Sequence, residues 1–383
     1  MNSFTINGKT FTSAYLHGLN SFQVKSALKP YVIYWDESDN PFQRINALLK
    51  ENSNNVLLID ENVLRLYQSF LTVELSQIFS VNASESFKTL ESVTALLDFL
   101  CQRDFTKDEK LIVVGGGIIQ EIGAFVGTCY KRGIKWVHFP TTLLSMSDSC
   151  LGGKIGINYK GVKNQIALFG TPTAVVIHPF FLQSLTEEAL RSGLGEILKS
   201  CIIGGEAFLS IYQQCVQQGK VHSLHDYKIL VLNALSIKRA IVEEDEFELN
   251  HRRSLNYGHT LGHAIEVMSD YAITHGLAVT LGMIVANELS YRRNLLKLSQ
   301  KERLNKLCLE LLPDAMGKCM QAISFHNLLP LLQKDKKAES RHVSFVMMKE
   351  IGDIHFIKLL LNNDLLNEIK QIVQGIFYCN AIS

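Results

Sequence analysis

Short runs of apolar, β-branched residues recur along the first half of the chain. They predict strands at residues 31–35, 56–59, 111–114, 136–139 and 174–177. Helical patterns over 86–102 and 118–130 separate several of these runs. Strands that alternate with helices are typical of a parallel sheet covered on both faces. Ahead of them, the pair Asn7-Gly8 predicts a tight hairpin turn.

The pattern changes near residue 180, and from Thr186 onward a period of about 3.6 residues dominates. It predicts helices at 187–203, 206–218, 225–243, 256–269, 276–297, 300–312 and 361–374. A late hairpin is predicted from 343–348 and 354–359. We therefore expect two domains, an α/β Rossmann-like domain at 1–185 and a mainly α-helical domain at 186–383.

Composition narrows the functional classes. With 47% hydrophobic and 20% charged residues, the 383-residue chain fits an ordered globular protein. A net charge of +1 gives no basic surface for nucleic acid or an anionic membrane. The N-terminus lacks a signal-peptide pattern, and no apolar run reaches the roughly 18 residues of a membrane span. Eight cysteines without a Cys-x-x-Cys pair indicate reduced thiols, so we expect a cytoplasmic protein.

The segment Leu111–Glu121 has the order strand, Gly-Gly-Gly turn and helix start. Glycines allow the backbone to approach a pyrophosphate, and the free N–H groups of the helix attract its charge. A tight turn without any ligand explains the same residues. The role of Asp60, after the strand 56–59, also has two interpretations. An acidic residue there can bind a ribose hydroxyl, or it can cap the next helix.

A second candidate binding segment, Pro140–Lys154, is rich in small and polar residues and is followed by Lys163-Asn164. We expect both lysines in a glycine-containing loop, where an ammonium group can reach an anionic ligand. The alternative is a solvated loop. Asp148, close to the turn Gly152-Gly153, favours the binding site.

Three histidines suggest a metal. His259 and His263 lie four residues apart at the start of a predicted helix, and His275 precedes the next one. The spacing makes His259 and His263 candidate ligands. Glu196 is a candidate third ligand, although an ion pair with Lys199 explains its spacing too. One glutamate and two histidines suit zinc acting on an oxygen substrate. For any one histidine, a structural role in the core is the alternative.

The order of these motifs resembles the 3-dehydroquinate synthases, which are sugar phosphate cyclases. The shared motifs, between about Asp60 and Lys337, are Gly-Gly-Gly, Pro-Thr-Thr-Leu-Leu, Asp-Ser-x-x-Gly-Gly-Lys, Lys-Asn, Gly-x-x-Glu-x-x-Lys, Arg-x-x-Leu-Asn-x-Gly-His-Thr-x-Gly-His-Ala-Ile-Glu and His-Gly-x-Ala-Val. The resemblance implies an N-terminal NAD-binding domain, a helical metal-binding domain, an active site between them and a homodimer.

The resemblance also implies roles for individual residues. Zinc, or cobalt, would bind Glu196, His259 and His275, and His263 would face the substrate instead. NAD would contact Asp60, Asn62, Glu85, Lys88, Gly115, Gly116, Gly117, Glu121, Thr141, Thr142 and Lys163. The substrate would contact Asp148, Lys154, Asn164, Lys199, Lys238, Arg252, Asn256, His263 and one of Lys336 or Lys337, and Arg132 would reach the substrate phosphate of the neighbouring subunit. Catalytic roles would fall to Lys154, Lys199, Lys238, His263 and Glu248, the last as a proton acceptor.

The implied reaction is a step of the shikimate pathway, which leads to aromatic amino acids. It cyclises 3-deoxy-arabino-heptulosonate 7-phosphate with loss of phosphate. NAD removes a hydride and later returns it, zinc acidifies a substrate hydroxyl, phosphate leaves by elimination, and an aldol step closes the ring. Because NAD is regenerated, there is no net redox change and the enzyme is a lyase.

Three positions depart from the family pattern. Glu121 stands where aspartate is usual, Leu277 where glutamate is usual, and Ser192 where asparagine is frequent. They leave open a paralogue for an uncarboxylated sugar phosphate, of the 2-epi-5-epi-valiolone synthase or 2-deoxy-scyllo-inosose synthase type. A metal-dependent polyol or alcohol dehydrogenase with the same two-domain plan is the second alternative. The basic residues Lys238 and Arg252 favour the carboxylated substrate.

Overall fold

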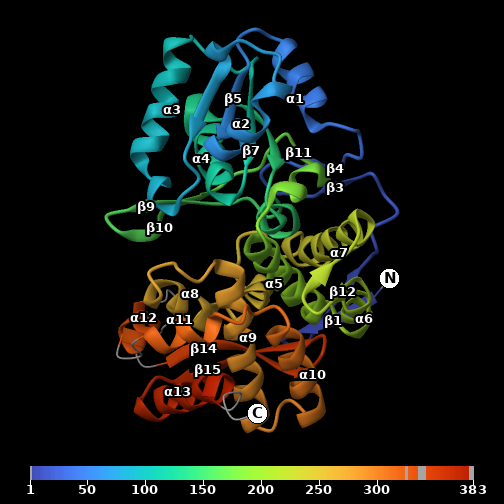
Figure 1. Cartoon of the computed structure of the whole chain (residues 1–383), viewed down its shortest axis with the longest axis vertical. Helices are drawn as coiled ribbons and strands as arrows, with labels where there is room; N and C mark the ends of the chain where they lie inside the picture. Colours follow the sequence, from blue (N-terminus) through green and yellow to red (C-terminus); the bar gives the residue numbers. More distant parts are fainter. Residues whose placement is uncertain (1, 324–326, 335–341, 379–383) are drawn as a thin grey trace. The chain divides into compact units, whose positions relative to one another are not determined.

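The computed structural model describes residues 2–323, 327–334 and 342–378. Its chain divides into two compact units (Figure 1). One unit spans Leu16–Leu185, and the other joins Met1–Tyr15 to Thr186–Ser383.

A seven-stranded sheet forms the centre of the unit Leu16–Leu185. Its strands, in spatial order, are β3 (Ser21–Val24), β4 (Tyr31–Trp35), β11 (Ala174–Ile177), β8 (Lys135–Pro140), β7 (Lys110–Gly115), β5 (Val56–Asp60) and β6 (Ile78–Val81). Neighbours pair in parallel, except β3 with β4. All five predicted strands are present. Every residue of β5 is buried, as expected for a strand with both faces covered.

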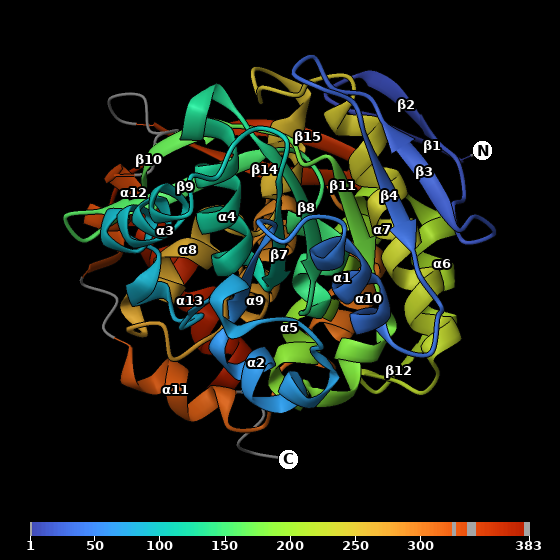
Figure 2. The same ribbon diagram turned by 90° about the horizontal axis from the view of Figure 1, so that it is seen from above.

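Four helices belong to this sheet: α1 (Pro41–Lys50), α2 (Glu61–Tyr67), α3 (Leu90–Gln102) and α4 (Gly117–Cys129). Figures 1 and 2 show α3 and α4 on one side of the sheet and α1 on the other. Leu96 and Ile122 join Val113 in one buried core cluster. Side-chain caps set the starts of three helices, with Asn40 before α1, Asp60 before α2 and Thr89 before α3.

The stretch that contains Lys154 and Lys163 is a hairpin, which corrects the loop predicted from its glycines. Strands β9 (Lys154–Tyr159) and β10 (Val162–Phe169) pair in antiparallel fashion, with an irregularity between Val162 and Ile166. The apolar residues Ile155 and Ile157 alternate with Lys154, Gly156 and Asn158 and belong to the core cluster that includes residues of α3 and α4. This alternation outweighs the glycines as a signal.

The second unit contains a four-stranded sheet, in the order β14 (His342–Glu350), β15 (Asp353–Leu360), β1 (Asn2–Ile6) and β2 (Lys9–Ser13). Both predicted hairpins are therefore present. The N-terminal hairpin was assigned to the first domain, but it belongs here, because β1 pairs in parallel with β15 through Thr5 and Asp353. A strand pairing between chain ends leaves no signal in local periodicity.

Helices make up most of the second unit. They are α5 (Glu187–Gly204), α6 (Glu206–Cys215), α7 (Leu224–Val242), α8 (His259–Met268), α9 (His275–Arg292), α10 (Leu298–Leu309), α11 (Met316–Ala322), α12 (Leu328–Lys334) and α13 (Asn363–Tyr378). Two further short strands, β12 (Val216–Gln217) and β13 (Lys220–Val221), pair with each other. The helix predicted at 256–269 starts later, after a 3-10 turn at His251–Asn256. The short helices α11 and α12 were not predicted.

Two observations bear on the sequence-based expectations for the environment. No helix in the described part of the chain is long and apolar enough to cross a membrane. Every cysteine among the described residues is a free thiol, in agreement with the scattered spacing.

Candidate active site

The metal candidates come from three helices that pack unusually closely. A Cβ atom at Gly276 of α9 would collide with the Ser192 carbonyl of α5, and one at Gly195 would lie 2.5 Å from the Gly276 carbonyl. Glycine at these positions therefore lets the two helix backbones touch. The contact places His275, the first residue of α9, beside Glu196 in the middle of α5.

The distances in this group fit one divalent ion. Glu196 Oε1 lies 3.6 Å from His259 Nε2 and 3.5 Å from His275 Nε2. Ligand atoms about 2.0–2.2 Å from a tetrahedral zinc lie about 3.3–3.6 Å from one another. An ion could thus contact all three atoms with small adjustments.

Hydrogen bonds orient both imidazoles for this purpose. His275 Nδ1 pairs with Glu266 Oε2 at 3.0 Å, and His259 Nδ1 pairs with the carbonyl of Tyr257 at 3.2 Å. With Nδ1 as the donor in both pairs, each ring turns its Nε2 toward Glu196. Sequence reasoning missed Glu266, although its carboxylate ends the quoted motif and could have been recognised as a partner for a metal-bound histidine.

The electrostatics also favour a cation. Glu196 is fully buried, its Oε2 forms an ion pair with the Lys199 ammonium, and its Oε1 faces the two histidines. Burial opposes its ionisation, but Lys199 and His275 outweigh that effect and lower its pKa. Burial would also lower the pKa of His275, whereas Glu196 and Glu266 raise it to about 10. The position between these two carboxylates therefore attracts positive charge, and the donor set fits a metal ion.

His263 is more exposed and lies one helical turn beyond His259. Its ring centroid is 5.3 Å from that of His259 and 5.7 Å from that of His275. The ligand atoms of the three histidines lie within 4.8 Å of one another, so a three-histidine site is the geometric alternative. Burial and the neighbouring Lys199 lower the pKa of His259, which keeps this ligand neutral.

Three of the predicted substrate residues of this unit, Lys238, Arg252 and Asn256, lie in α7 and in the segment that follows it. Lys238 on α7 and Arg252 in the 3-10 turn are both buried. Asn256 donates from Nδ2 to Glu248 Oε1 at 2.9 Å. The remaining candidates, Lys336 and Lys337, lie outside the described residues.

The predicted NAD residues are in the unit Leu16–Leu185, along one edge of the sheet. Asp60 ends β5, Gly115 ends β7 and Thr141 follows β8, so the strand register brings them to the same edge. Gly116 caps α4, and Thr142 lies beside it, since a Cβ at Gly116 would come within 3.0 Å of Thr142. The first turn of α4 thus offers backbone N–H groups at this edge.

Two details of this edge refine the prediction. Asp60 caps α2 by accepting the Asn62 N–H at 2.8 Å, so the helix-cap interpretation holds, and burial raises the pKa of the Asp60 carboxyl. Buried His138 was missed. Its Nε2 lies 3.3 Å from the Gly115 carbonyl, and burial lowers its pKa to about 4, so the neutral ring donates to the glycine turn.

A charge network around buried Lys88 joins residues predicted to bind NAD and substrate. Lys88 donates to Glu121 Oε2 at 2.7 Å and to Asn164 Oδ1 at 2.8 Å, and its ammonium lies 3.3 Å from Glu85. Burial would lower the pKa of Lys88, but Glu121 and Glu85 raise it. Lys163 lies at the edge of this network, with its Nζ 3.9 Å from Glu85 Oε1.

Asp148, Lys154 and Arg132 complete the predicted set. Asp148 lies in a π-helical turn at Ser145–Ser149, and Gln120 holds that turn through two hydrogen bonds with Ser149, at 2.6 and 2.7 Å. Lys154 is exposed at the start of β9. Arg132 is exposed beyond α4 with a left-handed backbone, φ 62°.

Comparison with known proteins decides the family. Family models described as 3-dehydroquinate synthase N-terminal and C-terminal match residues 78–192 and 193–338. A 3-dehydroquinate synthase from Streptococcus equi is 33% identical over 345 residues, which cover 88% of this chain and 94% of the relative. The chain belongs to the 3-dehydroquinate synthase family.

Solved structures support the same fold. A 2-deoxy-scyllo-inosose synthase, complexed with carbaglucose-6-phosphate, NAD+ and Co2+, has a TM-score of 0.79 at 20% identity and covers 93% of this chain and 100% of that one. A 2-epi-5-epi-valiolone synthase from Streptomyces hygroscopicus, with NAD+ and Zn2+ bound, has a TM-score of 0.75 at 23% identity and covers 92% and 98%. The predicted family, fold class and enzyme class, a phosphate-eliminating cyclase, are confirmed.

The structure shows which groups surround Leu277 and Glu121, two of the three departures from the family pattern. Leu277 is buried in the core cluster of α8, α9 and β14, where a glutamate would have to bury its charge. Glu121 spans from Lys88 to the backbone N–H of Gly156, 3.2 Å from Oε1, and the shorter aspartate could not keep both contacts.

Ser192, the third departure, supports the metal-binding end of α9. Its Oγ accepts the backbone N–H of Gly276 at 3.0 Å in a buried setting. We expect Ser192→Ala to lower the free energy of unfolding by about 1–3 kcal/mol, because that N–H loses its partner. We also expect weaker metal binding, since His275 is adjacent. Denaturant unfolding and metal titration measure both effects, with exposed Ser210→Ala of α6 as the control. Equal behaviour of the two variants would contradict this role.

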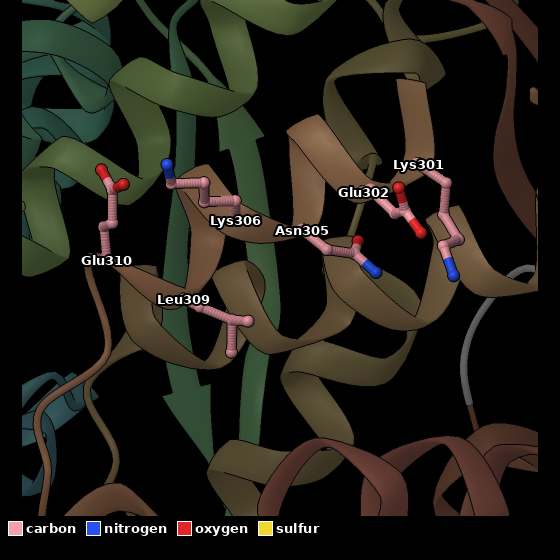
Figure 3. Close-up of a pocket in the computed structure, with 6 residues that line it drawn as sticks. All are labelled: Lys301, Glu302, Asn305, Lys306, Leu309 and Glu310. Atoms are coloured by element: carbon pink, nitrogen blue, oxygen red, sulfur yellow. The ribbon is translucent and has the colours of Figure 1, made fainter. Parts of the chain in front are cut away.

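A surface hollow on α10 is separate from these groups. Figure 3 shows its lining, which consists of Lys301, Glu302, Asn305, Lys306, Leu309 and Glu310. None of the predicted site residues lies there. The hollow carries both charge signs in near balance and offers no selective attraction for an anionic sugar phosphate.

Proposed function

We propose that this protein is a 3-dehydroquinate synthase, which converts 3-deoxy-arabino-heptulosonate 7-phosphate to a carbocycle with loss of phosphate. The observation that carries the proposal is the 33% identity to a curated 3-dehydroquinate synthase over 94% of its length. The buried cations Lys238 and Arg252 support it, because the substrate bears both a carboxylate and a phosphate.

The proposal includes NAD and a divalent ion, with zinc as the first candidate. Glu196, His259 and His275 would hold the ion, and the edge formed by Asp60, the glycine turn of β7 and Thr141 would hold NAD. When bound, NAD takes up and returns a hydride, and the ion acidifies a substrate hydroxyl. The buried carboxylate of Glu196, with Oε1 3.5–3.6 Å from both Nε2 atoms, supports the metal assignment.

The side chains of the unit that includes Thr186–Ser383 would then position the substrate and move its protons. Arg252 offers a planar fork that matches a carboxylate, and Lys238 adds a second buried charge. Glu248 is held by Asn256 and would act as the proton acceptor, with His263 facing the substrate. We also infer a homodimer, in which exposed Arg132 reaches the substrate phosphate of the neighbouring subunit. Light scattering on the purified enzyme tests the dimer.

A substrate panel tests the function. The purified enzyme, with NAD and zinc, is offered 3-deoxy-arabino-heptulosonate 7-phosphate, sedoheptulose 7-phosphate, glucose 6-phosphate and glycerol. We expect phosphate release from the heptulosonate without accumulation of NADH. Phosphate release only from an uncarboxylated sugar would instead identify a paralogous cyclase. Net NADH formation with glycerol would identify a dehydrogenase.

Arg252→Lys tests the carboxylate. A lysine keeps the charge but cannot form the paired hydrogen bonds of the guanidinium. We therefore expect the variant to lose about 2–4 kcal/mol of transition-state binding, measured as a lower kcat/KM for the heptulosonate. On an uncarboxylated sugar phosphate the loss should be small. Exposed Arg253→Lys is the matched control. Equal losses on both kinds of sugar would remove Arg252 as the carboxylate-binding residue.

A further inference from the structure

The loop that follows α7 is folded around the carboxylate of Asp245. Oδ1 accepts the backbone N–H of Leu249 at 2.9 Å, and Oδ2 accepts those of Asn250 and Arg252 at 2.8 and 2.9 Å. Asp245 is buried, with 8% of its surface exposed. One side chain thus fixes the backbone over residues 249–252.

This loop carries the side chains assigned to the substrate. Glu248 has a left-handed backbone, φ 58°, and its N–H donates to the Asp245 carbonyl at 3.3 Å. A non-glycine residue in that region costs about 1–2 kcal/mol, so surrounding contacts must hold it there. Asn256 then bonds to the Glu248 carboxylate, and the Arg252 guanidinium donates to the Glu246 carbonyl. Each of these geometries depends on the path of the backbone around Asp245.

We propose that Asp245 is a positioning residue, which sets the backbone from which Glu248, Arg252 and Asn256 reach the substrate. The inference rests on the proposed function, because it takes these three side chains to act on a sugar phosphate. Asp245 acts through the loop and touches no substrate itself. Nothing in the sequence motif singled it out, since its partners are backbone N–H groups that any residue supplies.

A carboxylate is the side chain that this loop requires. Burial opposes ionisation of Asp245, but the N–H groups of Arg252, Asn250 and Leu249 lower its pKa, so it is charged at neutral pH. An asparagine would keep one acceptor oxygen and would turn its NH2 group toward a backbone N–H. At least one of the three hydrogen bonds would be lost, because the asparagine NH2 group and a backbone N–H, both donors, would face each other.

The test compares Asp245→Asn with Glu244→Gln. Glu244 is the preceding carboxylate, half exposed and paired with Lys9 at the surface. Assays use the panel sugar from which the wild-type enzyme releases phosphate. We expect Asp245→Asn to lower kcat/KM by roughly 10–100-fold, as for a displacement of catalytic groups by about 1 Å. NAD affinity and metal content should stay within about twofold, because the residues assigned to them lie elsewhere. Glu244→Gln should match the wild type.

A double variant separates positioning from general stability. If Asp245 acts through Arg252, Asp245→Asn combined with Arg252→Lys should lose less than the product of the two single losses. Additive losses, or an Asp245→Asn enzyme that melts earlier but keeps its kcat/KM, would overturn the proposal. If Asp245→Asn does not fold, Asp245→Glu, which keeps the charge but displaces the oxygens, takes its place in the same comparison. Turnover of a different sugar would overturn only the proposed function, whereas no turnover of any sugar would overturn both.

Discussion

Glu196→Gln is expected to leave the purified enzyme without a bound divalent ion and with almost no turnover. The substitution removes the charged ligand and leaves the Lys199 ammonium buried without its partner. Loss of one partner of a buried pair costs about 3–5 kcal/mol of stability, and the uncompensated Lys199 charge also repels a cation from the site, so we expect metal affinity to fall strongly. Metal content after dialysis, measured by mass spectrometry, reports the effect independently of activity.

His263→Asn is the matched comparison for Glu196→Gln. It removes an imidazole from the same cluster, whereas Glu196 Oε1 faces the rings of His259 and His275. We expect this variant to keep its ion and to lose turnover. The opposite outcome, with the ion lost from His263→Asn and kept by Glu196→Gln, would establish the three-histidine site instead. Circular dichroism checks that both variants are folded.

Gly116→Val is the second substitution with a large expected effect, on NAD binding. A Cβ added at Gly116 would lie within 3.0 Å of Thr142. The branched valine would also fill the space above the first turn of α4. A pyrophosphate would lose contact with the N–H groups there. Loss of two charge-assisted hydrogen bonds corresponds to about 3–6 kcal/mol, or on the order of 10²–10⁴-fold in NAD affinity.

Isothermal titration with NAD measures this loss directly. Gly18→Ala is the control, because Gly18 lies in the same unit and a Cβ there would meet no atom within 4 Å. Its NAD affinity should equal that of the wild type. Unchanged affinity in Gly116→Val would place the cofactor elsewhere.

The local pattern of apolar residues was enough to predict the alternating strands and helices of the unit Leu16–Leu185. The strand 56–59 was found because a buried parallel strand is apolar at every position, and 31–35 because aromatic and β-branched residues favour a strand. The hairpin β9–β10 was misread as a loop, because its glycines and lysines masked a short alternation. The N-terminal hairpin was placed in the wrong unit, because its pairing with β15 joins the two ends of the chain.

The site shows the same division. The sequence by itself determined the residue types: the glycine turn, the histidines and the acidic and basic side chains whose chemistry indicates NAD, a metal and an anionic substrate. The spacing of His259 and His263 pointed to both as ligands, because helical periodicity reports only neighbours on one helix. Tertiary structure decided that Glu196 faces His259 and His275, through the close crossing of α5 and α9 at Gly195 and Gly276. It also decided that Asp245 organises the substrate loop, because bonds from a side chain to distant backbone groups depend on the folded path and leave no mark on the pattern of the chain.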